Sequence, residues 1–507
     1  MENNSRLVNS VNNIIYGMIN KIIMLILTFI SRTVFVHALS TEYLGINGLF
    51  TDVLTLLSLA DLGLGTAMAY SFYKPLAEKD EKQLAALTHF YKRIYSFIAI
   101  SVASVGIILL PFIKHIVNTD KYIPLLEVYY LVFLANTVIS YLFVYKSTII
   151  AADQKSHLIS KYTLCVNFTK VIIQILILYL TSNYLAYIII NVLATLTNNL
   201  LLSHKADTLY PYTKQKAILD QHSKKNIFSN IKSLFLYKFS SVILNGTDNI
   251  LISTMIGTLS VGLYSNYYII TYNLMTISNL FFNSITASVG NIIVKEDEIK
   301  NYGIFKLLQM ISFWLSGVFS ICLLLLAQDF IRIWLGTGYL ITQWTLIAIV
   351  LNFYLELCFP PVWSFREATG LFQKTNYIMI ITAFLNLIFS IILGNYFQMA
   401  GIFFATFLSK LFTIFWYEPN LLYTTYFKRN PMEYYKSHSI NAILVICSVF
   451  LLYAIAQIIK TNDWLSLILK GILVFVSVNL IYILRYCKTP EFQQLLAKLK
   501  KLVKKVR

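Results

Sequence analysis

The sequence predicts an all-α polytopic membrane protein with about fourteen transmembrane helices. Of its 507 residues, 57% are apolar and only 13% are charged, which is about half the ~25% charged fraction of soluble domains. The apolar residues come in runs of roughly 20, the length that crosses ~30 Å of hydrocarbon. This composition excludes a soluble enzyme, a secreted disulfide scaffold and a disordered protein.

Apolar runs separated by short polar segments define the individual spans. Pro360 and Pro361 close the tenth span, where a helix stop or kink is expected because proline lacks an amide hydrogen. The five cysteines form no C-x-x-C pair, so neither a disulfide framework nor a metal site is expected. The predicted spans cover about 11–38, 44–73, 90–112, 122–151, 159–180, 184–203, 229–258, 262–293, 304–327, 341–363, 374–394, 399–418, 440–460 and 464–484.

Basic residues predict the orientation of the spans. The net charge is +18, from 41 Lys and Arg against 23 Asp and Glu. With the N-terminus in the cytoplasm, about 25 basic residues lie in or beside cytoplasmic segments. Only four lie in or beside external loops: Lys114, Lys121, Arg332 and Lys460. Because cytoplasmic loops are enriched in Lys and Arg, both termini are predicted to be cytoplasmic, and the positive charge needs no nucleic-acid partner.

Two halves of six spans each are predicted, followed by an appended pair. An offset of 217 residues aligns Asn13 with Asn230, Lys21 with Lys238, Thr41 with Thr258 and Gly45 with Gly262. Halves of equal topology predict a parallel repeat with a central cavity between two bundles. The predicted domains are an N-lobe (1–203), a basic cytoplasmic inter-lobe loop (204–228), a C-lobe (229–418), two extra helices (419–485) and a basic amphipathic cytoplasmic tail (486–507). The tail is expected to lie on the anionic inner leaflet.

Several short motifs, in order along residues 5–485, carry a family resemblance. They are residues 43–45 (YLG), 58–67 (SLADLGLGTA), 245–248 (NGTD), 261–267 (VGLYSNY), 365–370 (FREATG) and 416–419 (WYEP). Together they resemble the Wzx-type polysaccharide and O-antigen flippases of the multidrug/oligosaccharidyl-lipid/polysaccharide (MOP) exporter superfamily. The resemblance implies two six-helix lobes facing across a V-shaped cavity, as in MATE transporters, with two extra C-terminal helices.

The resemblance also implies a transporter rather than an enzyme. Its expected activity is alternating-access flipping of a polyprenyl-pyrophosphate-linked oligosaccharide across the bacterial cytoplasmic (inner) membrane. This step serves the assembly of cell-surface polysaccharide, either O-antigen or capsule. The expected partners are that lipid-linked oligosaccharide, membrane lipids and the glycan polymerase machinery.

Basic residues deep in the predicted spans are the candidate substrate ligands. A lipid-facing charge at a span centre would cost about 2.5–3.5 kcal/mol, so these residues should face a wet cavity or an acidic partner. They are Lys21, Lys170, Lys238 and Lys410. The aligned pair of Lys21 and Lys238 is favoured to line the cavity, whereas structural roles are favoured for the other two.

Helical spacing adds two residues to the aligned lysines. Arg32 shares a helix face with Lys21, and Asn245 shares one with Lys238. These four residues are expected to form a cationic cavity for an anionic headgroup such as a pyrophosphate, because a lysine ammonium can hold and release phosphate. The alternative is that buried aspartates neutralise both lysines and simply join the helices.

Three acidic residues within the spans have two interpretations. Asp61, Asp248 and Glu356 either bind a coupling cation, H+ or Na+, or form structural contacts. The structural interpretation is favoured. No other cofactor, no catalytic group and no metal ligand is expected, because the histidines lie near span ends without paired spacing.

Two functions besides the flippase remain open. A cation-coupled multidrug antiporter of the same superfamily is disfavoured, because a basic cavity would repel cationic drugs. A membrane glycan polymerase or ligase is disfavoured more strongly, because its acceptor site would need longer external loops than this chain has.

Overall fold

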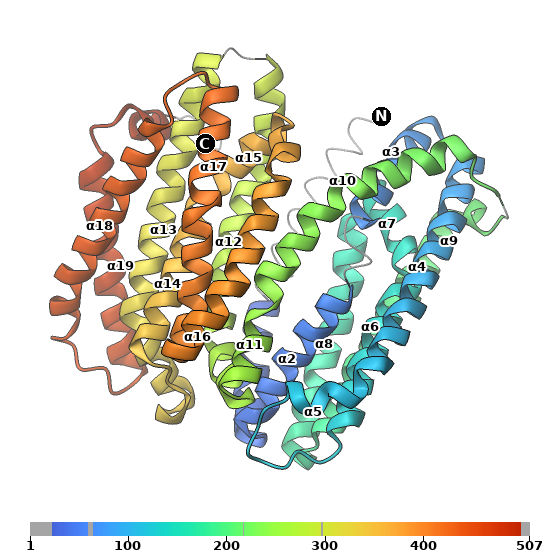
Figure 1. The fold of residues 1–507 in the computed structure, drawn as a ribbon, viewed down its shortest axis with the longest axis horizontal. Helices are drawn as coiled ribbons and strands as arrows, with labels where there is room; N and C mark the ends of the chain where they lie inside the picture. Colours follow the sequence, from blue (N-terminus) through green and yellow to red (C-terminus); the bar gives the residue numbers. More distant parts are fainter. Residues whose placement is uncertain (1–22, 59–63, 216, 296–297, 498–507) are drawn as a thin grey trace, which may run out of the picture. The chain divides into compact units, whose positions relative to one another are not determined.

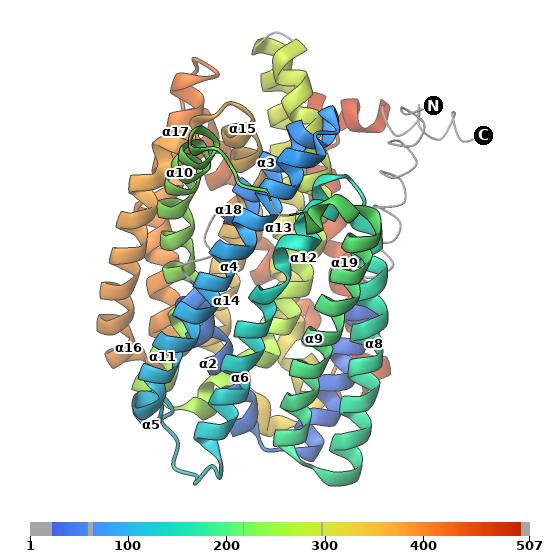
Figure 2. The same ribbon diagram turned by 90° about the vertical axis from the view of Figure 1, so that its right-hand side faces the viewer.

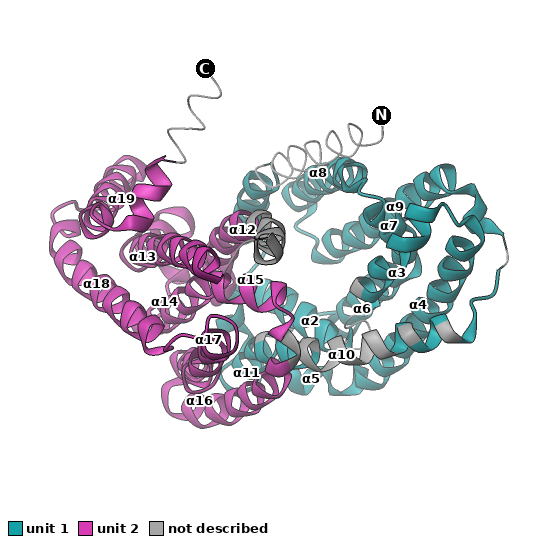
Figure 3. Cartoon of the chain, turned by 90° about the horizontal axis from the view of Figure 1, so that it is seen from above, with its two compact units in different colours: residues 1–262 teal, residues 263–507 magenta. Residues whose placement is uncertain are grey.

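The computed structural model describes residues 23–58, 64–215, 217–295 and 298–497, and their regular secondary structure is entirely helical (Figure 1). The chain divides into two compact units, residues 1–262 and 263–507 (Figure 3). The predicted all-helical architecture is thereby confirmed. Its basis is that a lipid-facing segment must satisfy its own backbone hydrogen bonds, which a helix does internally.

Unit 1 is built from helices that pack side by side. Helix α6 packs against both α4 and α9, and α8 packs against α9 (Figure 2). Its helices are a first helix Ile23–Ala38, α2 (Thr41–Leu57), α3 (Leu64–Glu78), α4 (Glu81–Leu109), η2 (Leu110–Phe112), α5 (Ile113–Ile116), α6 (Leu126–Leu142), α7 (Val144–Ala152), α8 (Ser156–Thr181), α9 (Tyr184–Leu209), η3 (Pro211–Lys214), α10 (Gln221–Gly246) and α11 (Asp248–Met255). Helix α12 (Thr258–Lys295) begins in unit 1 and continues into unit 2.

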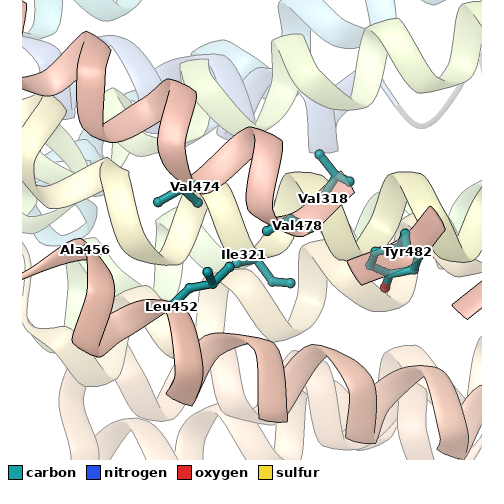
Figure 4. Packing of buried hydrophobic residues seen from close by; sticks show 7 residues of the cluster. All are labelled: Val318, Ile321, Leu452, Ala456, Val474, Val478 and Tyr482. Atoms are coloured by element: carbon teal, nitrogen blue, oxygen red, sulfur yellow. The ribbon is translucent and has the colours of Figure 1, made fainter. Parts of the chain in front are cut away.

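Unit 2 is organised around α13, which packs against α14, α15, α18 and α19. Part of its core lies among α13, α18 and α19 (Figure 4) and contains Val318, Ile321, Leu452, Ala456, Val474, Val478 and Tyr482. The remaining helices of this unit are α13 (Glu298–Leu335), η4 (Thr337–Tyr339), α14 (Gln343–Cys358), α15 (Pro360–Ala368), η5 (Leu371–Thr375), α16 (Asn376–Phe412), α17 (Ile414–Thr425), α18 (Met432–Ala456) and α19 (Trp464–Tyr486).

Many of these helices have the dimensions of membrane spans. Eight described stretches are long and apolar enough to cross a membrane, and the bent pair α6–α7 adds a ninth. The eight are Glu81–Ile116, Ser156–Thr181, Tyr184–Leu209, Glu298–Leu335, Gln343–Ala368, Asn376–Thr425, Met432–Ala456 and Trp464–Tyr486. The chain is therefore an all-helical multi-pass membrane protein, although the described stretches do not reach the predicted fourteen.

Three predicted spans are interrupted, which corrects the expectation of continuous helices. Segment 44–73 is divided between α2 and α3, segment 229–258 between α10 and α11, and segment 122–151 between α6 and α7, which meet at 46°. The break expected at Pro360 is confirmed, since α14 ends at Cys358 and α15 begins at this proline. Proline supplies no amide hydrogen to the preceding turn, so the first turn of a helix, where that hydrogen has no partner within the helix, accommodates it best.

Helix α16 folds back on itself. Gln398 has non-helical dihedral angles, φ 52° and ψ −135°. A Cβ atom on Gly401 would lie 2.0 Å from the carbonyl oxygen of Leu393, and the Asn386 amide donates to the Thr406 hydroxyl at 2.9 Å. These contacts join residues before Gln398 to residues after it in antiparallel order. The 50-residue stretch is therefore a helical hairpin, whose two legs correspond to the eleventh and twelfth predicted spans.

The start of α19 and the chain that follows this helix agree with local features of the sequence. Before α19, the Asp463 carboxylate accepts hydrogen bonds from the Ser466 amide at 2.9 Å and hydroxyl at 2.6 Å. These bonds stabilise the charged carboxylate and lower the pKa of Asp463. The chain after α19 is helical from residue 490 to residue 497, and the remainder of the predicted amphipathic tail lies outside the described residues.

Candidate functional site

Among the described glycines of unit 1, the closest approach between two helices joins the starts of α2 and α12. A Cβ atom on Gly45 would lie 2.0 Å from the carbonyl oxygen of Thr258, and one on Gly262 would lie 2.3 Å from that of Thr41. Any side chain larger than hydrogen would separate the two backbones at these points. The residues are the Thr-x-x-x-Gly pairs that the 217-residue repeat aligns, so each copy of the repeated motif packs against the other. We call this contact the T-x-x-x-G crossing.

Residues 116–121, the end of α5 and the segment that follows it, hold this crossing in place. The amide of Thr258 donates to the carbonyl oxygen of Asn118 at 2.7 Å. The Ser253 hydroxyl donates to the carbonyl oxygen of Ile116 at 2.8 Å. From the same segment, Lys121 forms a 2.7 Å ion pair with Glu42, the second residue of α2. The segment therefore holds both α2 and the start of α12 through polar contacts.

A polar contact joins α2 to α11, the helix that precedes α12. The Asn249 amide donates to the Asp52 carboxylate at 2.6 Å. Asp52 is half-buried, and its partner follows the NGTD motif by one residue. This hydrogen bond gives the acid a structural partner.

Arg32, a predicted substrate ligand, lies half-buried beside aromatic rings in unit 1. It is close to Tyr187, whose hydroxyl is hydrogen-bonded to Ser31. Phe35, one turn further along, packs against Tyr187 and Tyr184 with ring centroids 5.1 and 6.1 Å away. Arg32 is therefore held in a polar and aromatic setting, as expected for an intramembrane charge that avoids lipid.

The other predicted ligands are described only in part. Lys21 and Asp61 lie outside the described residues, and so do the side chains of Lys238 and Asn245, although α10 contains both positions. Asp248 is the first residue of α11, where a carboxylate interacts favourably with the positive end of the helix dipole. Their assignment to one cavity therefore stays a prediction.

Lys170 and Lys410 differ in their surroundings. Lys410 donates to the Glu356 carboxylate at 2.6 Å, which links α16 to α14. Lys170 on α8 is half-buried, and no ion pair joins it to another described residue. The Lys410–Glu356 pair agrees with the structural role favoured for Lys410.

Two motifs from the sequence meet in unit 2. Arg366, in the 365–370 motif on α15, forms an ion pair with Glu418, in the 416–419 motif on α17, and both side chains are almost fully buried. Sequence analysis missed this pair, although both residues were visible as charges inside family motifs. It also did not predict the role of Asp329. The carboxylate of this residue forms ion pairs with the Lys470 ammonium and the Arg332 guanidinium, each at 2.6 Å.

The described intramembrane charges of unit 2 are thus largely neutralised by pairing. Paired charges hold helices together and present little net field to a substrate. Among the described residues, no group of three or more His, Cys, Asp or Glu could hold a metal ion. The buried pairs described above attach one helix of unit 2 to another.

Solved structures with a similar fold are membrane transporters. The lipid II flippase MurJ, in its inward closed conformation, gives a TM-score of 0.67 at 16% identity and covers 94% of this chain and 100% of that chain. An inward-facing multidrug resistance MATE family transporter of the MOP superfamily gives a TM-score of 0.60 at 15% identity, covering 77% and 93%. An outward-facing MATE family transporter gives a TM-score of 0.53 at 14% identity and covers 80% of this chain and 92% of that chain. The chain therefore has the MurJ and MATE fold.

A search of the curated proteins finds no match to this chain. A sequence-family model described as "Polysaccharide biosynthesis protein" matches residues 10–290, which is more than half of the chain. This match confirms the resemblance inferred from the motifs, and with the fold it identifies a membrane transporter and not an enzyme. The chain belongs to the polysaccharide biosynthesis protein family.

Proposed function

We propose that this protein flips a polyprenyl-pyrophosphate-linked oligosaccharide from the inner to the outer leaflet of the bacterial cytoplasmic membrane. The observation that carries this proposal is the family match over residues 10–290. The fold it shares with a protein titled lipid II flippase supports the same class of cargo. We further propose that the chain has fourteen spans and cytoplasmic termini, and that two six-span lobes give the cargo alternating access to the two sides of the membrane.

The proposed substrate ligands are Lys21, Arg32, Lys238 and Asn245. Three cationic groups and an amide can bind the oxygens of a pyrophosphate, and lysine suits a site that must release its ligand again. The alignment of Lys21 with Lys238 supports a shared role, because intramembrane lysines are rare and these two occur in register.

For the three acidic candidates, Asp61, Asp248 and Glu356, we favour a structural role over binding of a coupling cation. Glu356 already accepts a hydrogen bond from Lys410 at 2.6 Å, so a coupling cation would have to compete with an ammonium group. Asp61 and Asp248 stay the candidate sites for H+ or Na+, or the partners of Lys21 and Lys238. We also propose a glycan polymerase as a partner, because an oligosaccharide delivered to the outer leaflet must next be assembled into polysaccharide.

A cation-coupled multidrug antiporter is the second candidate, supported by the MATE-like fold. A fold shared at about 15% identity is compatible with several cargoes. The basic character of the proposed cavity favours an anionic cargo over a cationic drug.

Lysine variants test the proposed function. Lys21→Ala and Lys238→Ala should abolish glycan export in a complementation assay while membrane protein levels stay normal, because each removes attraction for the pyrophosphate. Lys→Arg at either position keeps the charge and should retain partial export. Lys92→Ala, at an exposed position of α4, is the matched control and should export normally.

Two results would overturn the assignment. Normal export by the Lys21→Ala/Lys238→Ala double variant would show that the lysines do not bind cargo. Low membrane levels of the single variants, rescued by neutralising Asp61 or Asp248, would instead establish buried ion pairs.

A further inference from the structure

A cavity of about 190 Å³ lies in unit 2 among α13, α18 and the end of α19. Its lining residues come from the first halves of α13 and α18, from the end of α19 and from the residues that follow α19. One lining residue, Asn441, accepts a 2.9 Å hydrogen bond from Tyr482 of that core and donates one to Tyr354 at 3.0 Å. Hydrogen bonds of Asn441 therefore join the lining of the cavity to that core and to α14.

The charged residues that line this cavity are mainly basic. Lys306 and Arg485 both line it, and Glu491 is its one acidic lining residue. The Lys306 ammonium lies 4.0 Å from the Glu491 carboxylate, the outer limit of an ion pair. No ion pair joins Arg485 to another described residue; its guanidinium instead lies 5.5 Å from the centre of the Tyr486 ring. The site therefore has an excess of positive charge and of hydrogen-bond donors.

A buried amide adds an unused donor. Gln309 on α13 lines the cavity and is only 5% exposed. Its amide nitrogen has no hydrogen-bond acceptor among the described residues. A buried donor without an acceptor is unfavourable, and such groups in native structures call for a missing partner. An ammonium, a guanidinium and an amide around one cavity fit a ligand with several anionic oxygens, as a phosphate has.

Exposed apolar side chains next to lining residues favour a lipid as the source of that phosphate. Ile443 on α18 is 59% exposed and Leu484 on α19 is 69% exposed. Ile440, which lines the cavity itself, is also exposed. Exposed aliphatic side chains on membrane-spanning helices face acyl chains. A phosphate bound in the cavity would thus have hydrocarbon chains running along these helices.

We propose that this cavity binds the headgroup of an anionic phospholipid. Arg485, Lys306 and Gln309 donate to its phosphate oxygens, and the acyl chains lie against the apolar faces of α18 and α19. Because the site touches α13, α18 and α19 together, the bound lipid stabilises the attachment of the last two helices to unit 2. All lining residues of the cavity belong to unit 2, whereas the proposed cargo ligands are residues of unit 1, so the proposal does not depend on them.

Lipid binding to the purified full-length chain tests the proposal. Native mass spectrometry and thermal unfolding are measured with phosphatidylglycerol, phosphatidylcholine or inorganic phosphate added to delipidated protein. Phosphatidylglycerol should stay bound and raise the unfolding midpoint. The Lys306→Gln/Arg485→Gln variant should bind it at least about tenfold more weakly, because it removes two charge-assisted contacts. Lys436→Gln, an exposed cation on α18 outside the cavity, is the matched control.

A second variant keeps the proposal testable if the Lys306→Gln/Arg485→Gln variant folds poorly. Gln309→Leu keeps a buried side chain of similar size but removes the amide donor, so it should fold and lose part of the phosphatidylglycerol effect. Equal binding by wild type, the charge variant and Gln309→Leu would overturn the proposal. Equal effects of phosphatidylcholine would exclude selection for an anionic headgroup, and an equal effect of inorganic phosphate would exclude the lipid as the source.

Discussion

Replacing Gly45 with alanine tests the T-x-x-x-G crossing directly. The new Cβ atom would lie 2.0 Å from the carbonyl oxygen of Thr258 and 2.8 Å from its Cγ2 atom. A backbone oxygen cannot rotate aside as a flexible side chain can. The start of α2 would therefore have to move away from α12 by more than 1 Å to restore ordinary contact.

The expected destabilisation follows from two opposing effects. Overpacking a tight contact costs about 1–3 kcal/mol, and a backbone clash places Gly45→Ala near the upper end. Alanine recovers up to about 1 kcal/mol of helix propensity over glycine. The net loss for Gly45→Ala is therefore about 2 kcal/mol.

Gly48, one turn later on α2, supplies the matched control. A Cβ atom there would lie 3.4 Å from Val261 Cγ1, an ordinary van der Waals distance. Gly48→Ala should therefore gain up to about 1 kcal/mol from helix propensity alone. The two alanine variants of the same helix should differ by about 3 kcal/mol in the free energy of unfolding.

Thermal and denaturant unfolding of the purified variants, followed by far-UV circular dichroism, measures this difference; all six tryptophans lie in unit 2, so their fluorescence would not report on this contact. Gly262→Ala should behave like Gly45→Ala, because its Cβ atom would lie 2.3 Å from the carbonyl oxygen of Thr41. If Gly45→Ala proves as stable as Gly48→Ala, the close approach of α2 and α12 does not exist in the folded protein.

Two further predictions concern the ion pair of unit 2 and the topology. Glu418→Ala removes the carboxylate that the buried Arg366 contacts and should cost about 3–5 kcal/mol of stability; Arg366→Met/Glu418→Leu should restore most of it, and wild-type stability of Glu418→Ala alone would contradict the pairing. In a cysteine-free background, Asn118→Cys should react with an impermeant thiol reagent from outside, and Gln493→Cys only after permeabilisation. Reversed labelling would show that the predicted orientation is wrong.

Much of the fold was predictable because its signals are local. Apolar length and low charge density predict membrane helices, since each span must satisfy its backbone hydrogen bonds by itself. Pro360 predicted the break before α15 for an equally local reason. The interruptions of the second, fourth and seventh predicted spans were not predictable in this way, because an apolar run looks the same whether its helix is continuous or bent.

The charged residues of the candidate site were likewise predictable as local features, whereas their contacts were not. The sequence by itself placed Glu356 and Lys410 inside spans, and Arg366 and Glu418 inside family motifs, but it did not say that these charges pair. The members of each pair are separated by more than 50 residues, and their contact exists only because different helices pack together.

The repeated motif makes the limit clearest. The sequence by itself aligned Thr41 with Thr258 and Gly45 with Gly262, because repetition is a property of the order of residues. Only the tertiary structure decided that the two copies pack against each other, with each glycine facing a threonine carbonyl oxygen of the other helix. Glycine permits such an approach without demanding it, and the approach itself depends on the path of the chain between the two copies.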